Sequence, residues 1–404
     1  MSQDYQNNCS FCGNHRDQVS KLIVGDSAAI CNTCVDFCQG LLVDDAPASD
    51  LELLKQAQRV LDPRELKDYL DLHVIGQDDA KTMLSVSIIN HYKRINNTNP
   101  DVEIEKANIL MLGPTGSGKT LLARSVARYL EVPFAIADAT SITEAGYVGD
   151  DVETLIGRLL TAAGGDVEKC QKGIIFVDEI DKIARKGEST SITRDVSGEG
   201  VQQALLKVVE GTVCRVPSTG GRKHPGGDMI EIDTRNILFI AGGAFVGLEN
   251  IVGKRKQSSG IGFGAQVNQK VNGSLKETLP DDLVKYGLIP EFVGRFPNWV
   301  SLQELDKTAM IRILTEVKNN YIDQYKWLFE QDNIDLSFTD EAIDLIADRT
   351  VVTKTGARGL HSELERVLMP HMFNSYRYHA QGMKTLRITD ELVKIPMDLT
   401  EKAA

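Results

Sequence analysis

The chain has 404 residues, of which 42% are hydrophobic and 25% charged, and its net charge is −12. This length allows two or three domains, and the composition is ordinary for a globular protein. A net-acidic chain is a poor general partner for nucleic acid, because neutralisation of the phosphates supplies most of the affinity of proteins for nucleic acid. No apolar run approaches the ~20 residues of a membrane-spanning helix.

The first segment, MSQDYQNNC, has neither the basic start and apolar centre of a secretory signal nor the arginine-rich pattern of a transit peptide. We therefore expect a cytoplasmic protein with no membrane partner and no nucleic-acid partner.

A cysteine module comes first along the chain. Cys9, Cys12, Cys31 and Cys34 form the pattern C-x2-C-x18-C-x2-C, which is typical of two knuckles around one tetrahedral Zn²⁺. A disulfide framework is the alternative, and the absence of a secretory signal disfavours it. With four protein ligands the zinc is structural, one ion per chain, and it supplies folding energy that so short a module lacks. Because this module is acidic, we expect it to bind proteins or to dimerise.

The sequence predicts four segments: a zinc module over 1–45, a linker over 46–64, a nucleotide-binding domain over 65–304 and a smaller domain over 305–404. Asp62 can cap a new helix, and Pro63 suits its first position.

A phosphate-binding loop is the strongest motif. ANILML at 107–112 predicts a short strand, GPTGSGKT follows at 113–120, and LLARSVARYL continues as a helix. Lys119 is expected to reach the β- and γ-phosphates of ATP, and Thr120 to hold Mg²⁺. The predicted nucleotide-binding residues of this segment are Gly113, Pro114, Thr115, Gly116, Ser117, Gly118, Lys119, Thr120 and Leu121.

Two acids end another apolar strand, GIIFVDEIDK at 173–182. Asp178 is placed to bind Mg²⁺, directly or through water, and Glu179 to activate the attacking water. Asp181 is expected to be solvated or structural. The segments 132–139 and 236–243 predict further strands of a doubly wound sheet, with the ligand at the carboxyl ends of its strands. Asn236 starts its strand, so we do not expect it to sense the γ-phosphate.

Several segments predict loops. In EAGYVGDD at 144–151, Tyr147 and Val148 stand between two glycines and are expected to point outward. The basic clusters RKH at 222–224 and KRK at 254–256 are expected to lie in Gly-rich loops, the second within a loop over 250–275.

The final hundred residues predict a mainly helical domain. TEVKNNYIDQYKWLFE and TDEAIDLIADRT have helical periodicity, whereas KTLRITD and VKIP are short strand candidates. Two arginines stand out: Arg295 in GLIPEFVGRF, and Arg358 in TGARGL, which opens an amphipathic helix.

Taken in order, these segments resemble the ClpX family, the AAA+ ATP-dependent unfoldases that feed the ClpP peptidase. The resemblance covers nearly the whole chain and rests on the cysteine module, VIGQ at 74–77, GPTGSGKT, AGYVG, VDEIDK, SITRDVSGEGVQQALL, GGRKHP, IGFGA, GLIPEFVGR and GARGL. His361 after GARGL and the strand FPNWVSL depart from the family pattern.

The resemblance implies a ring, usually of six identical subunits, with ATP bound between neighbours. Val74 and Ile75 would contact the adenine. Arg295 would act in trans on the next subunit's ATP, beside Glu179 and Lys119 as the other catalytic residues, and Arg358 would reach the nucleotide of its own chain.

The resemblance also implies the surfaces that handle protein substrates. Tyr147 and Val148 would form the main pore loop, residues 197–200 part of a second loop, and Arg222, Lys223 and His224 a loop at the pore entrance. Ile261, Gly262 and Phe263 would dock into ClpP. The function implied is unfolding and translocation of tagged proteins, delivered directly or by adaptors, with no peptidase activity of its own.

Two other functions remain open at this stage. A zinc-ribbon ATPase stimulated by nucleic acid would load or remodel DNA or RNA, but the acidic first 50 residues argue against it. A scaffold gated by ATP would bind proteins without translocating them, but the Asp178–Glu179 pair and Arg295 argue against it.

Overall fold

The computed structural model describes residues 7–25, 28–35, 62–97, 99–143, 151–185, 198–217, 229–258 and 273–394. The chain divides into two compact units, Met1–Leu61 and Asp62–Ala404. None of the helices within those described ranges combines the length and the apolar character needed to cross a membrane.

The first unit is small. Strand β1 (Leu22–Val24) pairs antiparallel with β2 (Ala29–Cys31), and a short 3-10 helix, η2 (Arg16–Gln18), precedes them. Its buried apolar residues within the described ranges are Cys9, Ala29 and Cys31. So few buried side chains cannot stabilise a fold alone, which is the situation in which small domains use a metal or disulfides.

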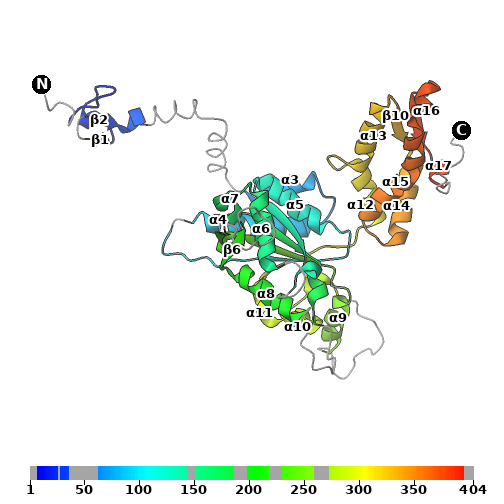
Figure 1. Ribbon diagram of the computed structural model, residues 1–404, viewed down its shortest axis with the longest axis horizontal. Helices are drawn as coiled ribbons and strands as arrows, with labels where there is room; N and C mark the ends of the chain where they lie inside the picture. Colours follow the sequence, from blue (N-terminus) through cyan, green and yellow to red (C-terminus); the bar gives the residue numbers. More distant parts are fainter. Residues whose placement is uncertain are drawn as a thin grey trace. The chain divides into compact units, whose positions relative to one another are not determined.

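The second unit is built on a sheet of five parallel strands in the order β4-β5-β8-β3-β9. Figure 1 shows the ribbon of the chain, with the helices that surround this sheet labelled. The register places Ile109 opposite Ile240 and Asn298, and Asp138 opposite Asp178. The strand bounds are β3 Ile109–Leu112, β4 Phe134–Asp138, β5 Ile174–Asp178, β8 Leu238–Gly243 and β9 Asn298–Ser301.

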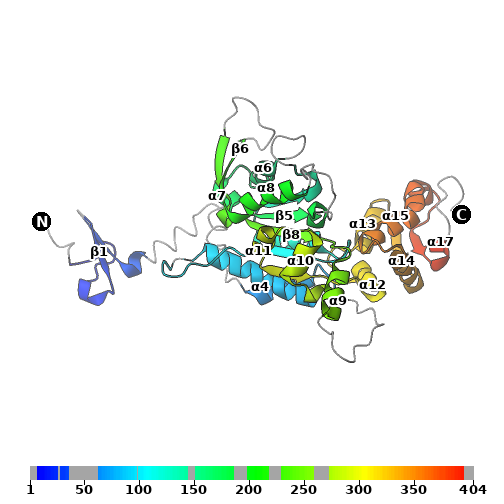
Figure 2. The same cartoon turned by 90° about the horizontal axis from the view of Figure 1, so that it is seen from below.

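Helices cover both faces of this sheet (Figure 2). Its central strands are accordingly almost wholly apolar and buried. Alternate residues such as Ile175, Val177 and Phe239 belong to a core shared with α6, α8 and α11. Because side chains alternate along a strand, the residues between them face away from that core, and the helix after the phosphate-binding loop, α5, contacts β5 and β8.

The remaining elements of this part frame the sheet. A two-stranded antiparallel ribbon, β6 (Val213–Pro217) and β7 (Met229–Asp233), stands apart from it. The helices are α3 Pro63–Asp71, α4 Asp78–Ile95, α5 Lys119–Leu130, α6 Val152–Ala162, α7 Val167–Gln171, α8 Glu199–Glu210, α9 Leu248–Ser258, α10 Pro280–Tyr286 and α11 Pro290–Gly294, with 3-10 turns η3 Ala139–Ser141, η4 Ile180–Ile183, η5 Thr234–Asn236 and η6 Leu275–Glu277. Helix α3 starts where predicted, with Asp62 accepting a hydrogen bond from the Arg64 amide at 2.8 Å.

The last part of the chain is mainly helical and has its own apolar core. Two short strands, β10 (Asp335–Phe338) and β11 (Thr385–Ile388), pair in parallel. The helices are α12 Lys307–Thr315, α13 Tyr321–Gln331, α14 Asp340–Thr353, α15 Arg358–Phe373, α16 Ser375–Ala380 and α17 Asp390–Lys394. The predicted fold class, an α/β chain with a cysteine module before it and a helical domain after it, is confirmed.

Three local predictions were wrong. Val393 and Lys394 of VKIP belong to helix α17, because Asp390 and Glu391 in its first turn favour a helix start after β11. KRK at 254–256 lies in α9 rather than in a loop, so helix replaces the first part of the loop predicted over 250–275. The periodic stretch beginning at 315 is broken between α12 and α13, where Asn319 has a φ of 60° and Asn320 caps α13.

Candidate functional site

The phosphate-binding loop joins β3 to α5 at the carboxyl edge of the sheet, the edge where the parallel strands end. Gly116 and Gly118 have φ values of +77° and +101°, which side chains rarely tolerate, so the glycines let the loop curl around the start of α5. The Lys119 ammonium donates to the Gly113 and Pro114 carbonyls at 2.6 and 2.9 Å. Burial lowers the pKa of Lys119, with Asp178 and Asp181 opposing the shift. A cation held inside such a loop suits a polyphosphate.

The two predicted acids lie at the end of β5, next to this loop. Asp178 accepts a hydrogen bond from the Thr120 hydroxyl at 3.1 Å. The Thr120 hydroxyl, in the first turn of α5, and the Asp178 carboxylate, at the end of β5, are in contact and offer two oxygen ligands suited to a hard cation such as Mg²⁺. Glu179 is exposed and has a φ of 57°, an uncommon backbone conformation for a non-glycine residue that is typical of functional turns.

Asp181 is structural, which is one of the two expectations for it. It is 7% exposed and accepts a hydrogen bond from the Ala244 amide at 3.1 Å, just past the end of β8. A Cβ on Gly243 would lie 2.8 Å from the Asp181 carboxylate, so glycine is required there. Asn236 lies at the other edge of the sheet, as predicted, where its side-chain oxygen accepts from Arg94 at 3.0 Å.

Val74 and Ile75 are buried, and they line an apolar cleft of about 470 Å³ beside the loop. Gly118 and Leu121 contribute to the same cleft, and Leu121 is 48% exposed within it. This volume lies in the range of small-molecule sites. The arrangement brings the residues predicted for the adenine next to those predicted for the phosphates.

The helical part of the chain closes against the same loop. The Ala357 amide donates to the Gly116 carbonyl at 3.1 Å, and Gly356 approaches Gly116 so closely that a Cβ on either would overlap the other's backbone. Arg358 follows at once as the first residue of α15, and its charge contributes to the lowering of the pKa of Lys119. The contact of Gly356 with the loop was not predicted from the sequence. The first glycine in TGARGL, just before a predicted helix, could have indicated a close backbone approach there.

Arg295 lies at the amino edge of the sheet, where the parallel strands begin. It precedes β9, and its carbonyl accepts from the Asn108 side chain at 2.9 Å, just before β3. Its guanidinium pairs with Glu210 at 2.9 Å. The phosphate-binding loop follows the other end of β3, about 13 Å away along four strand residues. Arg295 is therefore on the opposite edge of the sheet from the nucleotide loop of its own chain.

The cysteine cluster in the first unit fits a metal. The four Sγ atoms of Cys9, Cys12, Cys31 and Cys34 lie within 4.8 Å of one another. The Cys31 amide donates to Cys9 Sγ at 3.2 Å. Burial raises the pKa of Cys9, but amide donors from Cys12 and Cys31 outweigh it and lower that pKa to about 6. Burial and the three neighbouring thiols raise the pKa of Cys34. Without a cation, four thiolates at such short range repel one another, and a bound zinc ion would relieve this. No other group of three or more potential metal ligands occurs within the described ranges.

Other predicted residues lie outside the described part of the chain. These are Tyr147 and Val148 of the predicted pore loop, Arg222, Lys223 and His224 of the predicted entrance loop, and Ile261, Gly262 and Phe263 of the predicted docking loop.

Comparison with known families gives three matches along the chain. Residues 7–44 match the ClpX C4-type zinc finger, and residues 104–299 match the AAA domain (Cdc48 subfamily). Residues 305–383 match the C-terminal, D2-small domain of ClpB protein.

The chain is a ClpX-type AAA+ ATPase.

This family membership supports an unfoldase role and implies ATP as the nucleotide at the site described above. The zinc-finger match and the cysteine geometry together support zinc in the first unit. The family also suggests that this ClpX-type ATPase forms an oligomeric ring.

Proposed function

We propose that this ATPase unfolds tagged proteins, pulls them through the pore of a homo-hexameric ring and delivers them to the ClpP peptidase. In this proposal residues 1–45 bind adaptors or dimerise, 46–64 are a linker, and 65–304 and 305–404 are the large and small AAA+ domains.

The observation that carries the proposal is the separation of Arg295 from its own nucleotide loop. An arginine finger neutralises charge on the γ-phosphoryl and can accelerate hydrolysis by about 10³–10⁵. Arg295 is an exposed residue on the opposite edge of the sheet from Lys119. If it acts on ATP, that ATP belongs to a neighbour. A head-to-tail interface that places one edge against the other generates a ring when its rotation closes.

The other proposed roles are supported by contacts and positions within one chain. Lys119 and the loop from Gly113 to Leu121 hold the phosphates, Thr120 and Asp178 hold Mg²⁺, and Glu179 activates water. Val74 and Ile75 contact the adenine. Arg358 reaches the phosphates from the small domain, so hydrolysis changes the angle between the two domains.

The substrate-handling roles rest on the sequence and on family membership. Tyr147 and Val148 would grip a polypeptide by non-polar contact without sequence demand. Arg222, Lys223 and His224 would attract acidic tags at the pore entrance. Ile261, Gly262 and Phe263 would dock into ClpP as exposed apolar anchors.

The decisive experiment uses a stable fluorescent protein carrying an unstructured tag, with Mg·ATP, a trap for unfolded chains and no peptidase. We expect ATP-dependent loss of fluorescence. Tyr147→Ala should keep ATP hydrolysis and lose unfolding, whereas Tyr147→Phe, which keeps the aromatic ring, should retain both. Intact fluorescence across varied tags, with ATP still hydrolysed, would contradict the unfolding role.

Delivery is tested separately. Adding ClpP should convert unfolding into degradation, and Phe263→Ala should abolish degradation while leaving unfolding unchanged. Degradation that survives Phe263→Ala would show that docking uses another segment.

A further inference from the structure

Helix α8 contacts two segments that carry proposed catalytic residues. The first follows Glu179 and runs through η4 to Ile183. The second, residues 287–295, ends at Arg295. One residue of α8, Gln202, is hydrogen-bonded to both.

Gln202 has no exposed surface. Its side-chain amide donates to the Ile183 carbonyl at 2.8 Å and to the Gly287 carbonyl at 3.2 Å. Its side-chain oxygen accepts from the Ile289 amide at 2.8 Å. Both ends of the amide are thus used, and an apolar side chain here would leave buried backbone groups without partners.

The short helix α11 links the residue that contacts Gln202 to Arg295. Ile289 is its N-cap residue and Arg295 its C-cap residue, with five helical residues between them. Phe292 and Phe296 are buried, with ring centroids 4.8 Å apart, so the segment packs as a unit. The hydrogen bond to the Ile289 amide therefore fixes the position of the Arg295 backbone.

Helix α8 holds α11 at its other end as well. Glu210 pairs with the Arg295 guanidinium at 2.9 Å, and eight residues, or about 12 Å of helix, separate Glu210 from Gln202. The Glu210–Arg295 pair is exposed and exchangeable, with about half of the arginine in contact with solvent, whereas the Gln202 contacts are buried.

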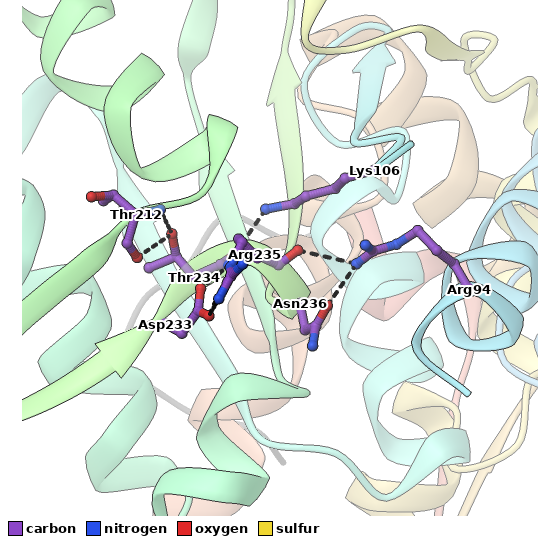
Figure 3. Close-up of polar contacts among 7 residues, drawn as sticks. All are labelled: Arg94, Lys106, Thr212, Asp233, Thr234, Arg235 and Asn236. Atoms are coloured by element: carbon purple, nitrogen blue, oxygen red, sulfur yellow. Dashed lines mark hydrogen bonds and ion pairs between the residues drawn. The ribbon is translucent and has the colours of Figure 1, made fainter. Parts of the chain in front are cut away.

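The carboxyl end of α8 is itself anchored at the amino edge of the sheet. The Thr234 hydroxyl donates to the Val208 carbonyl at 2.9 Å. The Thr212 amide donates to the same hydroxyl at 2.9 Å, a contact that Figure 3 includes. Figure 3 also shows Lys106 and Arg94 donating to the carbonyls of Thr234 and Arg235. Both distances are 3.0 Å. A helix held in this way is a firm support for Gln202.

We propose that Gln202 is a positioning residue for Arg295. It joins the segment behind a subunit's own Glu179 to the arginine that the subunit offers its neighbour, so that the two move as one body. This inference rests on the proposed action of Arg295 in trans.

The test measures ATP hydrolysis by pure and mixed assemblies. Gln202→Leu alone should lower kcat about tenfold to a hundredfold, the range expected for a misplaced catalytic group, with little change in KM. Gln203→Leu is the matched control, because Gln203 is the next residue of the same helix and is exposed; it should behave as wild type.

Mixing identifies which site is damaged. A Glu179→Gln subunit should hydrolyse its own ATP only very slowly, but it offers an intact Arg295. Adding it in equal amount to Gln202→Leu should restore about half of the Gln202→Leu sites, because half of the neighbours then supply a well-placed arginine. Arg295→Ala mixed with Glu179→Gln should be restored likewise, and Lys119→Ala mixed with Glu179→Gln should not.

The outcomes separate the two claims. If Arg295→Ala is restored by mixing and Gln202→Leu is not, or if Gln202→Leu is fully active alone, the role of Gln202 is overturned and trans action stands. If Arg295→Ala hydrolyses ATP normally, or is not restored by mixing, the trans action itself fails.

A second variant, Gln202→Glu, tests the proposal even if Gln202→Leu does not fold. A protonated Gln202→Glu side chain keeps the acceptor for the Ile289 amide and one of the two donors of glutamine, whereas the ionised form keeps no donor. Burial raises the pKa of such a carboxyl. Its hydrolysis rate relative to wild type should therefore fall as pH rises from about 6 to 9. A ratio that does not change with pH would overturn the proposal.

Discussion

Replacing Gly356 by alanine tests whether the small domain acts on the nucleotide through the phosphate-binding loop. Gly356 has a φ of +63°, and a Cβ there would lie 2.8 Å from both the Gly116 Cα and the Thr115 carbonyl oxygen. These are backbone atoms, which cannot rotate away. The Ala357–Gly116 hydrogen bond and the start of α15 at Arg358 depend on the same approach.

Two contributions set the magnitude. A left-handed backbone costs about 1–2 kcal/mol for a residue with a Cβ, and a forced overlap in a packed region adds about 1–3 kcal/mol. Ordinary carbon–carbon contacts are about 3.5 Å or longer, so the two segments must separate by about 0.7 Å. A displacement approaching 1 Å at a catalytic group can lower the rate by up to about a hundredfold.

The matched control is Gly382→Ala. Gly382 has a φ of +78°, but a Cβ there would meet nothing within 4 Å. This variant should therefore have the backbone contribution alone. We expect both variants to lose stability in urea unfolding, and only Gly356→Ala to lose ATP hydrolysis, by about tenfold or more.

Steady-state hydrolysis and equilibrium nucleotide binding, measured with urea unfolding on the same samples, distinguish these effects. Equal hydrolysis by Gly356→Ala and Gly382→Ala would refute the reasoning, because it would mean that the close approach of the two glycines does not position Arg358.

Three further predictions follow from the same structure. Glu179→Gln should bind ATP and assemble but hydrolyse it about 10²–10⁴-fold more slowly, and near-normal turnover would remove Glu179 as the base. Burial, assisted by Arg94 and opposed by Asp233, lowers the pKa of Lys106 to about 7. In the unfolded chain this lysine keeps its proton up to about pH 10.4. The free energy of unfolding should therefore rise with pH above about 7, by at most about 1.4 kcal/mol per pH unit. Urea unfolding at pH 7 to 9 should show this rise in the wild type and not in Lys106→Met. Chelation of zinc, or the substitution Cys12→Ser, should unfold the first unit, measured as loss of amide-exchange protection over residues 7–35. Nucleotide binding should be unchanged, because residues 62–394 have apolar cores of their own.

The motifs themselves were readable from the sequence because each depends on local spacing. Four cysteines in two close pairs predict a zinc site, and a Gly-rich loop between a strand and a helix predicts phosphate binding. The structure brings the four sulfur atoms together, and it places Thr120 against Asp178 at 3.1 Å. The errors in VKIP and KRK arose where short segments carry too little periodicity to distinguish helix from strand or loop.

The sequence by itself determined the fold class, the phosphate-binding loop, the acid pair and the cysteine module, since each is a pattern within a few tens of residues. Tertiary structure alone decided that Arg295 lies on the opposite edge of the sheet from Lys119, that Gly356 contacts Gly116, and that Gln202 joins Ile183 to Ile289. These relations connect residues up to about 240 positions apart. They depend on strand order and helix packing, which no local spacing encodes.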